Sequence, residues 1–293
     1  WREGLAYNDV LGAQYQDFQF GGGRNELRVN GARLPRGQEM RAEVVRPYYT
    51  DLQRLAFVAS VDGTRDYFQF RRPIEPGNAV NLGQRSAVIG GITRIGSRGR
   101  LKLVGLSLTH SESHVDSTTV VIDRTGFQRD TGEALGRRYR GQNVVRANAL
   151  AGIRLMRFTP VQGFDALTGT QDIRVGLQVG VVYGQAIGIG AARDRDRFMA
   201  SGLYAGAGNA KMFVGTQWIG EARNDQGANA WDNHVVSGRL AWYFRPAVRQ
   251  LTLLSSEWSE GRDMRTPFQL TFADRTGGIL GHRRSNDAGA RRL

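Results

Sequence analysis

The four histidines are the side chains with the clearest potential for metal chemistry, and they are His110, His114, His234 and His282. His110 and His114 are four residues apart with Glu112 between them, a spacing that suits a metal ion on a helix. On a β-strand the same two side chains would lie about 13 Å apart and could not share an ion. Because the surrounding pattern is that of a strand, we expect no metal site.

Serines close to these histidines bring acyl-transfer chemistry into consideration. Ser107, Ser111 and Ser113 lie near His110 and Asp116 in the sequence. The chain has no nucleophile-elbow pattern, in which glycines flank a serine at a strand-to-helix turn. A membrane enzyme therefore ranks last among the functions considered, and we assign neither a catalytic residue nor a cofactor.

Two glycine-rich stretches have the composition of functional loops. The first, 21–23, precedes no helical pattern, so we interpret it as a tight turn and not as a phosphate cradle. The second, 277–284, combines glycines with His282, Arg283 and Arg284. Its composition fits a solvent-exposed loop, or a loop that folds into a polar interior and pairs with acidic residues there.

The net charge is +13 and is carried almost wholly by arginine, since the only lysines are Lys102 and Lys211. Nucleic-acid binding would require a basic stripe with interleaved aromatic residues, and the sequence has none. The arginines instead recur on the polar side of successive strands and in the connections. This distribution is typical of an arginine-rich interior and of loops beside anionic lipid headgroups, and we expect no nucleic-acid partner.

Strict alternation of apolar and polar residues determines the fold class. It is clearest at 172–184, recurs at 144–156 and 234–245, and is shorter at 39–44 and 55–62. The polar positions hold glycine, glutamine, serine and arginine, whereas the outer face of a soluble sandwich is usually poor in glycine. The polar residues that we expect to face an interior include Arg146, Arg154, Arg174, Gln178 and Arg239.

The lengths of the apolar runs indicate whether the chain would cross a membrane with helices or with strands. No run approaches the roughly 18 apolar residues of a membrane-spanning helix, whereas membrane strands need only about 10 residues of alternating polarity. With 40% hydrophobic residues and 39 glycines, residues 1–293 can form one domain. We therefore predict an all-β fold, an antiparallel transmembrane β-barrel in the bacterial outer membrane.

The connections between the predicted strands alternate between short and long, as in outer-membrane barrels. The short ones are 21–24, 47–54, 96–100, 206–210 and 245–249, and they are expected to face the periplasm. The long ones are 62–85, 112–142, 186–197 and 223–233. This division gives about thirteen strands, and 118–122 is β-prone enough to start an additional hairpin.

The first part of the chain carries a resemblance to a known family. Strands at 11–16, 25–31 and 38–45 are followed by Pro47-Tyr48-Tyr49-Thr50 and then by a strand from Leu55. This order resembles the start of the barrel in the outer-membrane assembly and secretion superfamily, the bacterial surface antigen proteins, which includes BamA, TamA and the two-partner secretion transporters. The Pro47–Thr50 turn is similar to the Pro-Tyr-Phe-Thr turn of the assembly factors.

A second stretch resembles the loop that folds into the barrel interior in this family. The residues concerned are Gly278, Ile279, Leu280, Gly281, His282, Arg283 and Arg284. Ile279 stands at the aliphatic position, Gly281 at the glycine and His282 at the aromatic position. Leu280 stands where the family has the arginine that anchors the loop, so either Arg283 or Arg284 replaces that arginine or the loop function is lost.

The resemblance implies a fold and a function. It implies a barrel of about sixteen strands when complete, with its closing strands after Leu293 and periplasmic domains before Trp1. It also implies that client polypeptides are inserted or exported without a cofactor, and that outer-membrane lipid, lipopolysaccharide and client proteins are the partners. The alternative is a passive pore whose arginine-lined interior prefers anions.

Overall fold

In a computed structural model of the chain, the structure describes residues 2–4, 7–50, 53–70, 78–122, 127–130, 135–165, 169–190, 192–247, 249–271, 288–289 and 291–292. Apart from one 3-10 turn, η1 (Leu135–Arg138), every regular element in these ranges is a β-strand. The described residues include no helix with the length and apolarity needed to span a membrane. The fold is therefore all-β, as the alternating sequence predicts.

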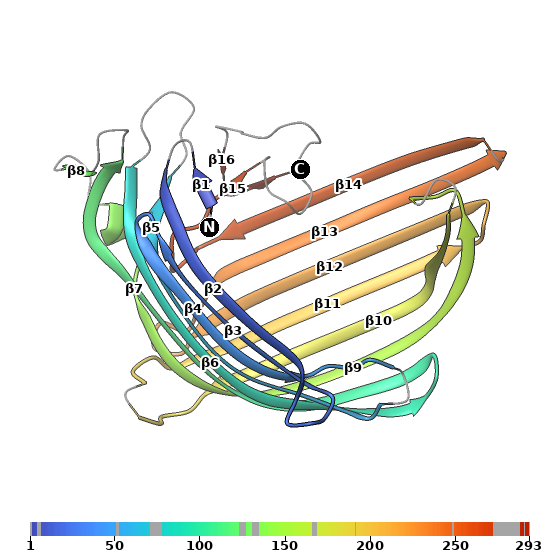
Figure 1. Ribbon diagram of the computed structural model, residues 1–293, viewed down its shortest axis with the longest axis horizontal. Helices are drawn as coiled ribbons and strands as arrows, with labels where there is room; N and C mark the ends of the chain where they lie inside the picture. The colour runs from blue at the N-terminus through green and yellow to red at the C-terminus, as the bar shows by residue number, and fades with distance from the viewer. Residues whose placement is uncertain are drawn as a thin grey trace.

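One curled antiparallel sheet of fifteen strands contains nearly all of these residues (Figure 1). The long strands of its first half are β2 (Tyr7–Phe20), β3 (Asn25–Leu34), β4 (Gly37–Arg46), β5 (Leu55–Gln69), β6 (Asn78–Ser97) and β7 (Arg100–Ile122). Those of its second half are β9 (Gln142–Gln162), β10 (Thr170–Ala186), β11 (Asp196–Gly208), β12 (Met212–Asp225), β13 (Ala230–Ala247) and β14 (Gln250–Arg262).

Five short strands complete the pairing. β1 (Arg2–Gly4), β8 (Phe127–Asp130) and β17 (Arg291–Arg292) extend the sheet from β2, β7 and β14. β15 (Leu270–Thr271) and β16 (Ala288–Gly289) form a separate two-stranded sheet. Among the described residues, no pairing joins the two ends of the large sheet, β1 and β17.

The strand register sorts apolar and polar side chains onto opposite faces of the sheet. One row of cross-strand neighbours consists of Leu27, Val44, Ala59, Ile89 and Leu108. In this row the side chain of Ile89 is 61% exposed and that of Leu108 47% exposed. On the opposite face, Glu43, Arg146 and Asn148 are buried. The usual distribution in a protein folded in water is therefore inverted.

Contacts between strands that are not neighbours identify the concave face. Arg146 of β9 binds Asp196 of β11, and Arg223 of β12 donates a hydrogen bond to Gln142 of β9. Such side chains can meet only on the inner side of a curled sheet. The polar face is therefore concave and the apolar face convex.

Small residues on the concave face permit the strong curl of β6, β7, β9 and β10 (Figure 1). Gly90, Ser107, Asn148 and Gly184 form one concave row across these strands. A Cβ atom on Gly90 would collide with the side chain of Ser107, and one on Gly184 with the side chain of Asn148. Bending brings side chains together on the inner face, so glycine is required where the row is tightest.

Most of the predicted strands are present, but three predicted connections, 62–85, 112–142 and 223–233, are wrong in extent, and β7 continues to Ile122 within the second of them. The strands predicted at 144–156, 172–184 and 234–245 correspond to β9, β10 and β13, and the predicted extra hairpin is β7–β8. The connection predicted at 62–85 shrinks to 70–77, and that at 223–233 shrinks to 226–229. These strands continue through polar residues such as Asp62 and Thr64, because ladder hydrogen bonds form between backbone groups and need no apolar side chain.

Candidate functional site on the concave face

A buried carboxylate at the start of β11 binds two guanidinium groups on the concave face. Asp196 accepts hydrogen bonds from Arg146 Nε and Nη2, at 2.6 Å each, through its two carboxylate oxygens. Arg265 Nη1 donates to Asp196 Oδ2 at 3.2 Å. Asp196 is 1% exposed, Arg146 4% and Arg265 5%. These charges interact away from water, where an ion pair is strong and an unpaired charge is costly.

Two further aspartates join this group at the ends of β12 and β13. Arg265 Nε donates to Asp232 Oδ2 at 2.7 Å, and Arg140 Nη2 donates to Asp225 Oδ2 at 2.6 Å. The backbone N–H of Arg140 also donates to the carbonyl oxygen of Arg265 at 3.0 Å. The chain after η1 and the chain after β14 are thereby held together. We call Arg140, Arg146, Asp196, Asp225, Asp232 and Arg265 the arginine–aspartate cluster.

The charge state of Arg265 follows from its surroundings. Burial by itself lowers the pKa of Arg265, but the hydrogen bond from Arg265 to Asp232 and the negative charges of Asp232, Asp196 and Asp225 outweigh burial. The pKa of Arg265 is therefore raised above its ordinary value. The surrounding aspartates therefore stabilise Arg265 as a cation.

A fourth guanidinium group adjoins the cluster. Arg223 of β12 donates to Gln142 Oε1, and its guanidinium carbon lies 5.9 Å from the centroid of the Phe198 ring. The guanidinium carbon of Arg146 lies 5.6 Å from the same centroid. The negative charge of Glu221 also acts on Arg223, so four arginines and four carboxylates lie together at this end of the concave face.

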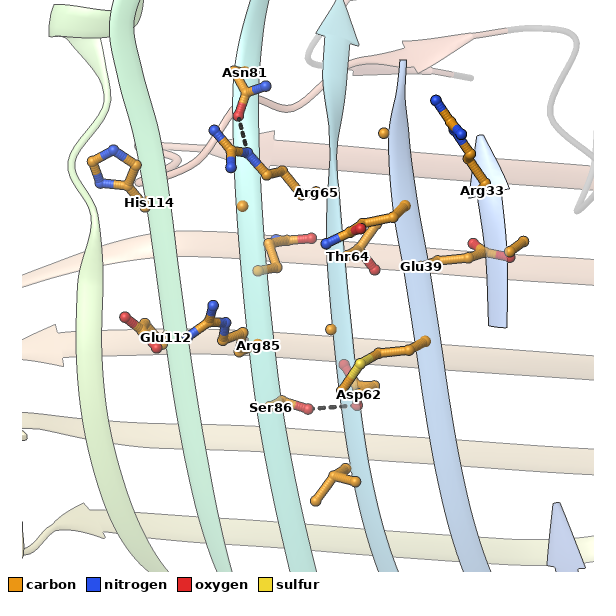
Figure 2. Close-up of a pocket in the computed structure, with 18 residues that line it drawn as sticks. Arg33, Glu39, Asp62, Thr64, Arg65, Asn81, Arg85, Ser86, Glu112 and His114 are labelled. Atoms are coloured by element: carbon orange, nitrogen blue, oxygen red, sulfur yellow. Dashed lines mark hydrogen bonds between the residues drawn. The ribbon is translucent and has the colours of Figure 1, made fainter. Parts of the chain in front are cut away.

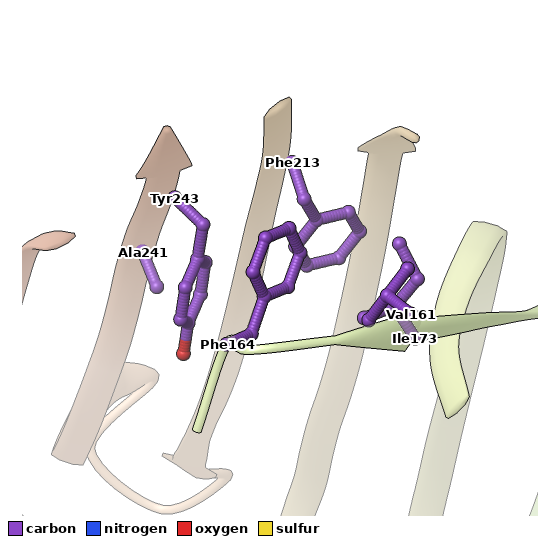
Figure 3. Close-up of a cluster of buried hydrophobic side chains, with 6 residues drawn as sticks. All are labelled: Val161, Phe164, Ile173, Phe213, Ala241 and Tyr243. Carbon is purple, nitrogen blue, oxygen red and sulfur yellow. The ribbon is translucent and has the colours of Figure 1, made fainter. Parts of the chain in front are cut away.

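The turn after β9 folds onto the concave face at the opposite end of the strands. Phe164 is 1% exposed, and its ring stacks on that of Tyr243 with centroids 5.0 Å apart (Figure 3). Tyr243 Oη donates to Asp165 Oδ1 at 2.8 Å. Gly163 permits this turn because its φ is 74°. A buried apolar cluster of Val161, Phe164, Ile173, Phe213, Ala241 and Tyr243 therefore crosses the inner side of the sheet.

The polar residues expected to face an interior lie on this same side of the sheet. Arg154 and Gln178 are direct cross-strand neighbours, and their row continues through Tyr204 and Gln217 to Arg239. Arg239 Nε lies 3.3 Å from Glu257 Oε1 on β14 in an exposed ion pair. Arg146, in contrast, belongs to the buried arginine–aspartate cluster.

Arg174 lies near the apolar cluster. Its guanidinium carbon is 4.2 Å from the centroid of the Tyr204 ring. Arg174 and Arg239 line one cavity of about 200 Å³ beside Phe164 and Asp165. The tight-turn end of the sheet is the end at which the short connections, such as that between β6 and β7, lie. Four of the five expected interior residues thus lie around the middle and the tight-turn end of the concave face. Arg146 lies near the other end.

The Pro47–Thr50 turn lies between β4 and β5 and is held by several hydrogen bonds. Tyr48 Oη donates to the carbonyl oxygen of Ile92 at 2.6 Å, and Arg94 Nη1 donates to that of Thr50 at 3.1 Å. The guanidinium carbon of Arg94 lies 3.4 Å from the centroid of the Tyr48 ring. The turn is therefore anchored to β6.

Tyr49 connects the same turn to β3, on the side away from β6. Its hydroxyl donates to Glu26 Oε1 of β3 at 2.7 Å, and this hydrogen bond is the largest influence that raises the pKa of Tyr49. Burial raises the pKa of Tyr48, and the positive charge of Arg94 offsets this only in part. Two adjacent tyrosines thus connect the turn to strands on both sides of it.

The geometry separates the residues of the acyl-transfer hypothesis. His110 and His114 share the convex face with Ile89, whereas Ser107 and Ser111 point to the concave face. His110 Nε2 lies 3.2 Å from Asn143 Oδ1. Within the described ranges, no group of three or more histidine, aspartate or glutamate side chains could hold a metal ion. These serines and histidines cannot act on one substrate because the sheet lies between them.

The second family-like stretch, Gly278 to Arg284, lies outside the described residues. The most buried groups of the concave face, Asp196, Arg265 and Phe164, were not among the residues predicted from the sequence. Asp196 had one usable signal, because Asp and Arg alternate from 193 to 197 up to the start of β11. Arg265 and Phe164 follow the ends of strands, where no periodicity indicates which way a side chain points.

No protein-family model and no curated protein sequence matches this chain, so its function must be argued from the geometry of the sheet and its concave face.

Proposed function

We propose that the chain forms the wall of a β-barrel in the bacterial outer membrane and belongs to an assembly or translocation factor for polypeptides. In this proposal the convex face contacts lipid and the concave face lines the lumen. The lumen, or a seam in the wall, accepts client polypeptides in transit to the membrane or the cell surface. The proposal involves neither covalent chemistry nor a cofactor.

The apolar convex face is the observation that carries this proposal. Leu106 is 72% exposed, Ile89 61% and Leu254 60%, and exposed apolar side chains occur on strands throughout the sheet. Monomeric soluble proteins rarely expose contiguous apolar patches beyond a few hundred Å². Transfer of each such side chain from water to an apolar phase is worth about 1.5–3 kcal/mol. A lipid environment accommodates this face, and the hydrogen-bond ladders between neighbouring strands pair the backbone groups there.

Aromatic side chains on the convex face support the same environment. Trp218 and Trp258 meet edge to face with ring centroids 5.1 Å apart. Trp242 and Phe244 stack with centroids 5.7 Å apart near the tight-turn end of β13. Amphipathic rings of this kind concentrate where a bilayer meets water.

The partly filled concave side favours a gated translocation factor over a steadily open pore. The apolar cluster around Phe164 occupies space on the concave side at one end of the strands, and the arginine–aspartate cluster does so at the other end. Opening such a lumen requires movement of the segments that fill it. The resemblance of the Pro47–Thr50 turn to the assembly and secretion superfamily also supports a translocation factor.

The second candidate is a passive pore that prefers anions. It is favoured by the concave row that contains Arg154 and Arg239. Fixed positive charges along a lumen concentrate anions and exclude cations.

Depletion of the protein in its host tests the first proposal. We expect the protein in the outer-membrane fraction, and we expect the levels of other outer-membrane or surface proteins to fall after depletion. Unchanged client levels in cells whose protein fractionates with the outer membrane would reject the translocation function and retain the barrel. Recovery of the protein in a soluble fraction would reject both.

Planar-bilayer recording separates the two candidates. A gated factor should show small, infrequent openings that become larger or more frequent in a Phe164→Ala variant. Large, steady, anion-selective openings of the unmodified protein would favour the passive pore. Lys102→Gln is a matched control, because Lys102 is exposed on the convex face at the same end of the strands.

A further inference from the structure

The convex face carries an apolar hollow bounded by β3, β4, β5, β6, β7 and β9. It has a volume of about 460 Å³. Small side chains form its floor, because Ala42, Ala59 and Ala87 lie among larger apolar residues of the same face. The larger residues are Leu27, Val44, Val61, Ile89, Leu108 and Val145. Apart from His110, the convex-face side chains that line this hollow are apolar, which suits an acyl chain better than a peptide backbone.

A second hollow continues from the first toward the ends of β3, β5 and β6. The two share Val61, and the second has a volume of about 1230 Å³. Arg33, Arg65 and Arg85 line it (Figure 2). Gly63 opens the space between Met40 and Arg85, since a Cβ atom there would lie 3.6 Å from Met40 Cγ and 3.9 Å from Arg85 Cγ. An apolar groove therefore leads directly to a group of arginines.

The register shows that these arginines point outward. Arg33 and Arg65 belong to one convex row through Gln38, and Arg85 belongs to the next convex row through Gly63. β3 and β5 are two strand spacings apart, about 10 Å. The three arginines therefore extend from strands that lie within about 15 Å of one another, a span comparable with that of a lipid headgroup.

The charges of these arginines are available to a ligand. Among the described residues, the one polar contact recorded for the three guanidinium groups joins Arg65 Nε to Asn81 Oδ1 at 3.4 Å. Glu112 is the acidic residue that faces outward here, opposite Arg85 in the register. Glu39 and Asp62 also adjoin the hollow, but they occupy alternate positions that point to the concave face. The outward surface therefore keeps an excess of positive charge.

We propose that this two-part hollow binds a phosphate-bearing, multiply acylated lipid of the outer leaflet, with the chemistry of lipid A. One acyl chain lies over Ala59 and Ala87, and the phosphate groups bind Arg33, Arg65 and Arg85. Guanidinium groups suit this role because their donor geometry matches phosphate oxygens. The inference rests on the proposed outer-membrane location and names a lipid partner for the wall, on the side of the long β7–β9 connection.

The test uses the full chain in detergent micelles and measures retention of labelled lipid A after washing. We expect the triple variant Arg33→Gln, Arg65→Gln and Arg85→Gln to bind lipid A about tenfold more weakly, because charge-assisted contacts to phosphate are lost. The matched control replaces three exposed arginines at the opposite end of the strands, Arg98, Arg100 and Arg157, and should bind as the unmodified protein does.

A second variant tests the apolar half of the hollow. Ala87→Trp fills the groove without a change in charge and should also weaken lipid A binding several-fold. Dephosphorylated lipid A should bind weakly to the unmodified protein, and millimolar inorganic phosphate should displace little lipid. Circular dichroism of each variant checks that the sheet is intact.

Three outcomes would overturn the inference. They are equal binding by the triple variant and its control, equal binding of phosphorylated and dephosphorylated lipid, and full displacement by inorganic phosphate, which would indicate a free-phosphate site. Membrane fractionation of the same variants keeps the two proposals apart. Outer-membrane location without selective lipid binding rejects this inference alone, whereas loss of membrane location in the unmodified protein rejects the proposed function.

Discussion

Replacement of Asp196 by asparagine should expose the energetic role of the arginine–aspartate cluster. The change preserves shape but removes the charge that Arg146 and Arg265 share. It also turns one acceptor of the bidentate pair with Arg146 into an amide donor. Two guanidinium groups that are 4% and 5% exposed are left without their common counter-charge.

The expected cost follows from burial. Breaking a buried ion pair by removing one partner costs about 3–5 kcal/mol, because the remaining charge is uncompensated. Asp232 still binds Arg265 at 2.7 Å, which moves the estimate to the lower end of that range. We therefore expect Asp196→Asn to lower the free energy of unfolding by about 3 kcal/mol.

Urea unfolding of the protein in lipid vesicles, followed by tryptophan fluorescence, measures this change. Glu257→Gln is the control, since its ion pair with Arg239 has side chains that are 28% and 56% exposed and should contribute about 0–1 kcal/mol. The double variant Arg146→Met with Asp196→Leu should recover much of the loss, because it leaves fewer unpaired charges. Equal effects of Asp196→Asn and Glu257→Gln would refute the reasoning.

Three further perturbations test other parts of the molecule. Phe164→Ala should lower the free energy of unfolding by about 3 kcal/mol, because it leaves a cavity in the apolar cluster, and urea titration would contradict this if the loss were below about 1 kcal/mol. Gly90→Ala should destabilise the sheet by about 1–3 kcal/mol through its collision with the concave row, whereas Gly180→Ala has open space and should be nearly neutral in the same assay. Tyr49 should ionise above its ordinary pKa because it donates to Glu26, so the folded state loses this contribution as pH rises through that raised pKa. Tyr49→Phe should remove one late step from the tyrosinate absorbance titration, and an unchanged titration would contradict that assignment.

The sequence predicted most of the strands because side-chain direction in a strand depends on local geometry alone. Alternation at 144–156 and 172–184 placed Arg154 and Gln178 on the polar face, and the register makes them cross-strand neighbours. The turn at Pro47 was also readable, since proline and tyrosines between two alternating runs mark a connection. What failed were boundaries such as 62–85, where polar residues on both faces hide a strand that backbone hydrogen bonds maintain.

The sequence by itself determined an all-β chain with one apolar and one polar face. It could not determine which residues meet across the curled sheet, because Arg146 and Asp196 are 50 positions apart and Arg265 lies a further 69 positions along the chain. The curl of the sheet decides which residues meet, since bending brings side chains of non-neighbouring strands within hydrogen-bond distance. Tertiary structure alone therefore created the arginine–aspartate cluster, turned Phe164 inward and brought Arg33, Arg65 and Arg85 together beside an apolar groove.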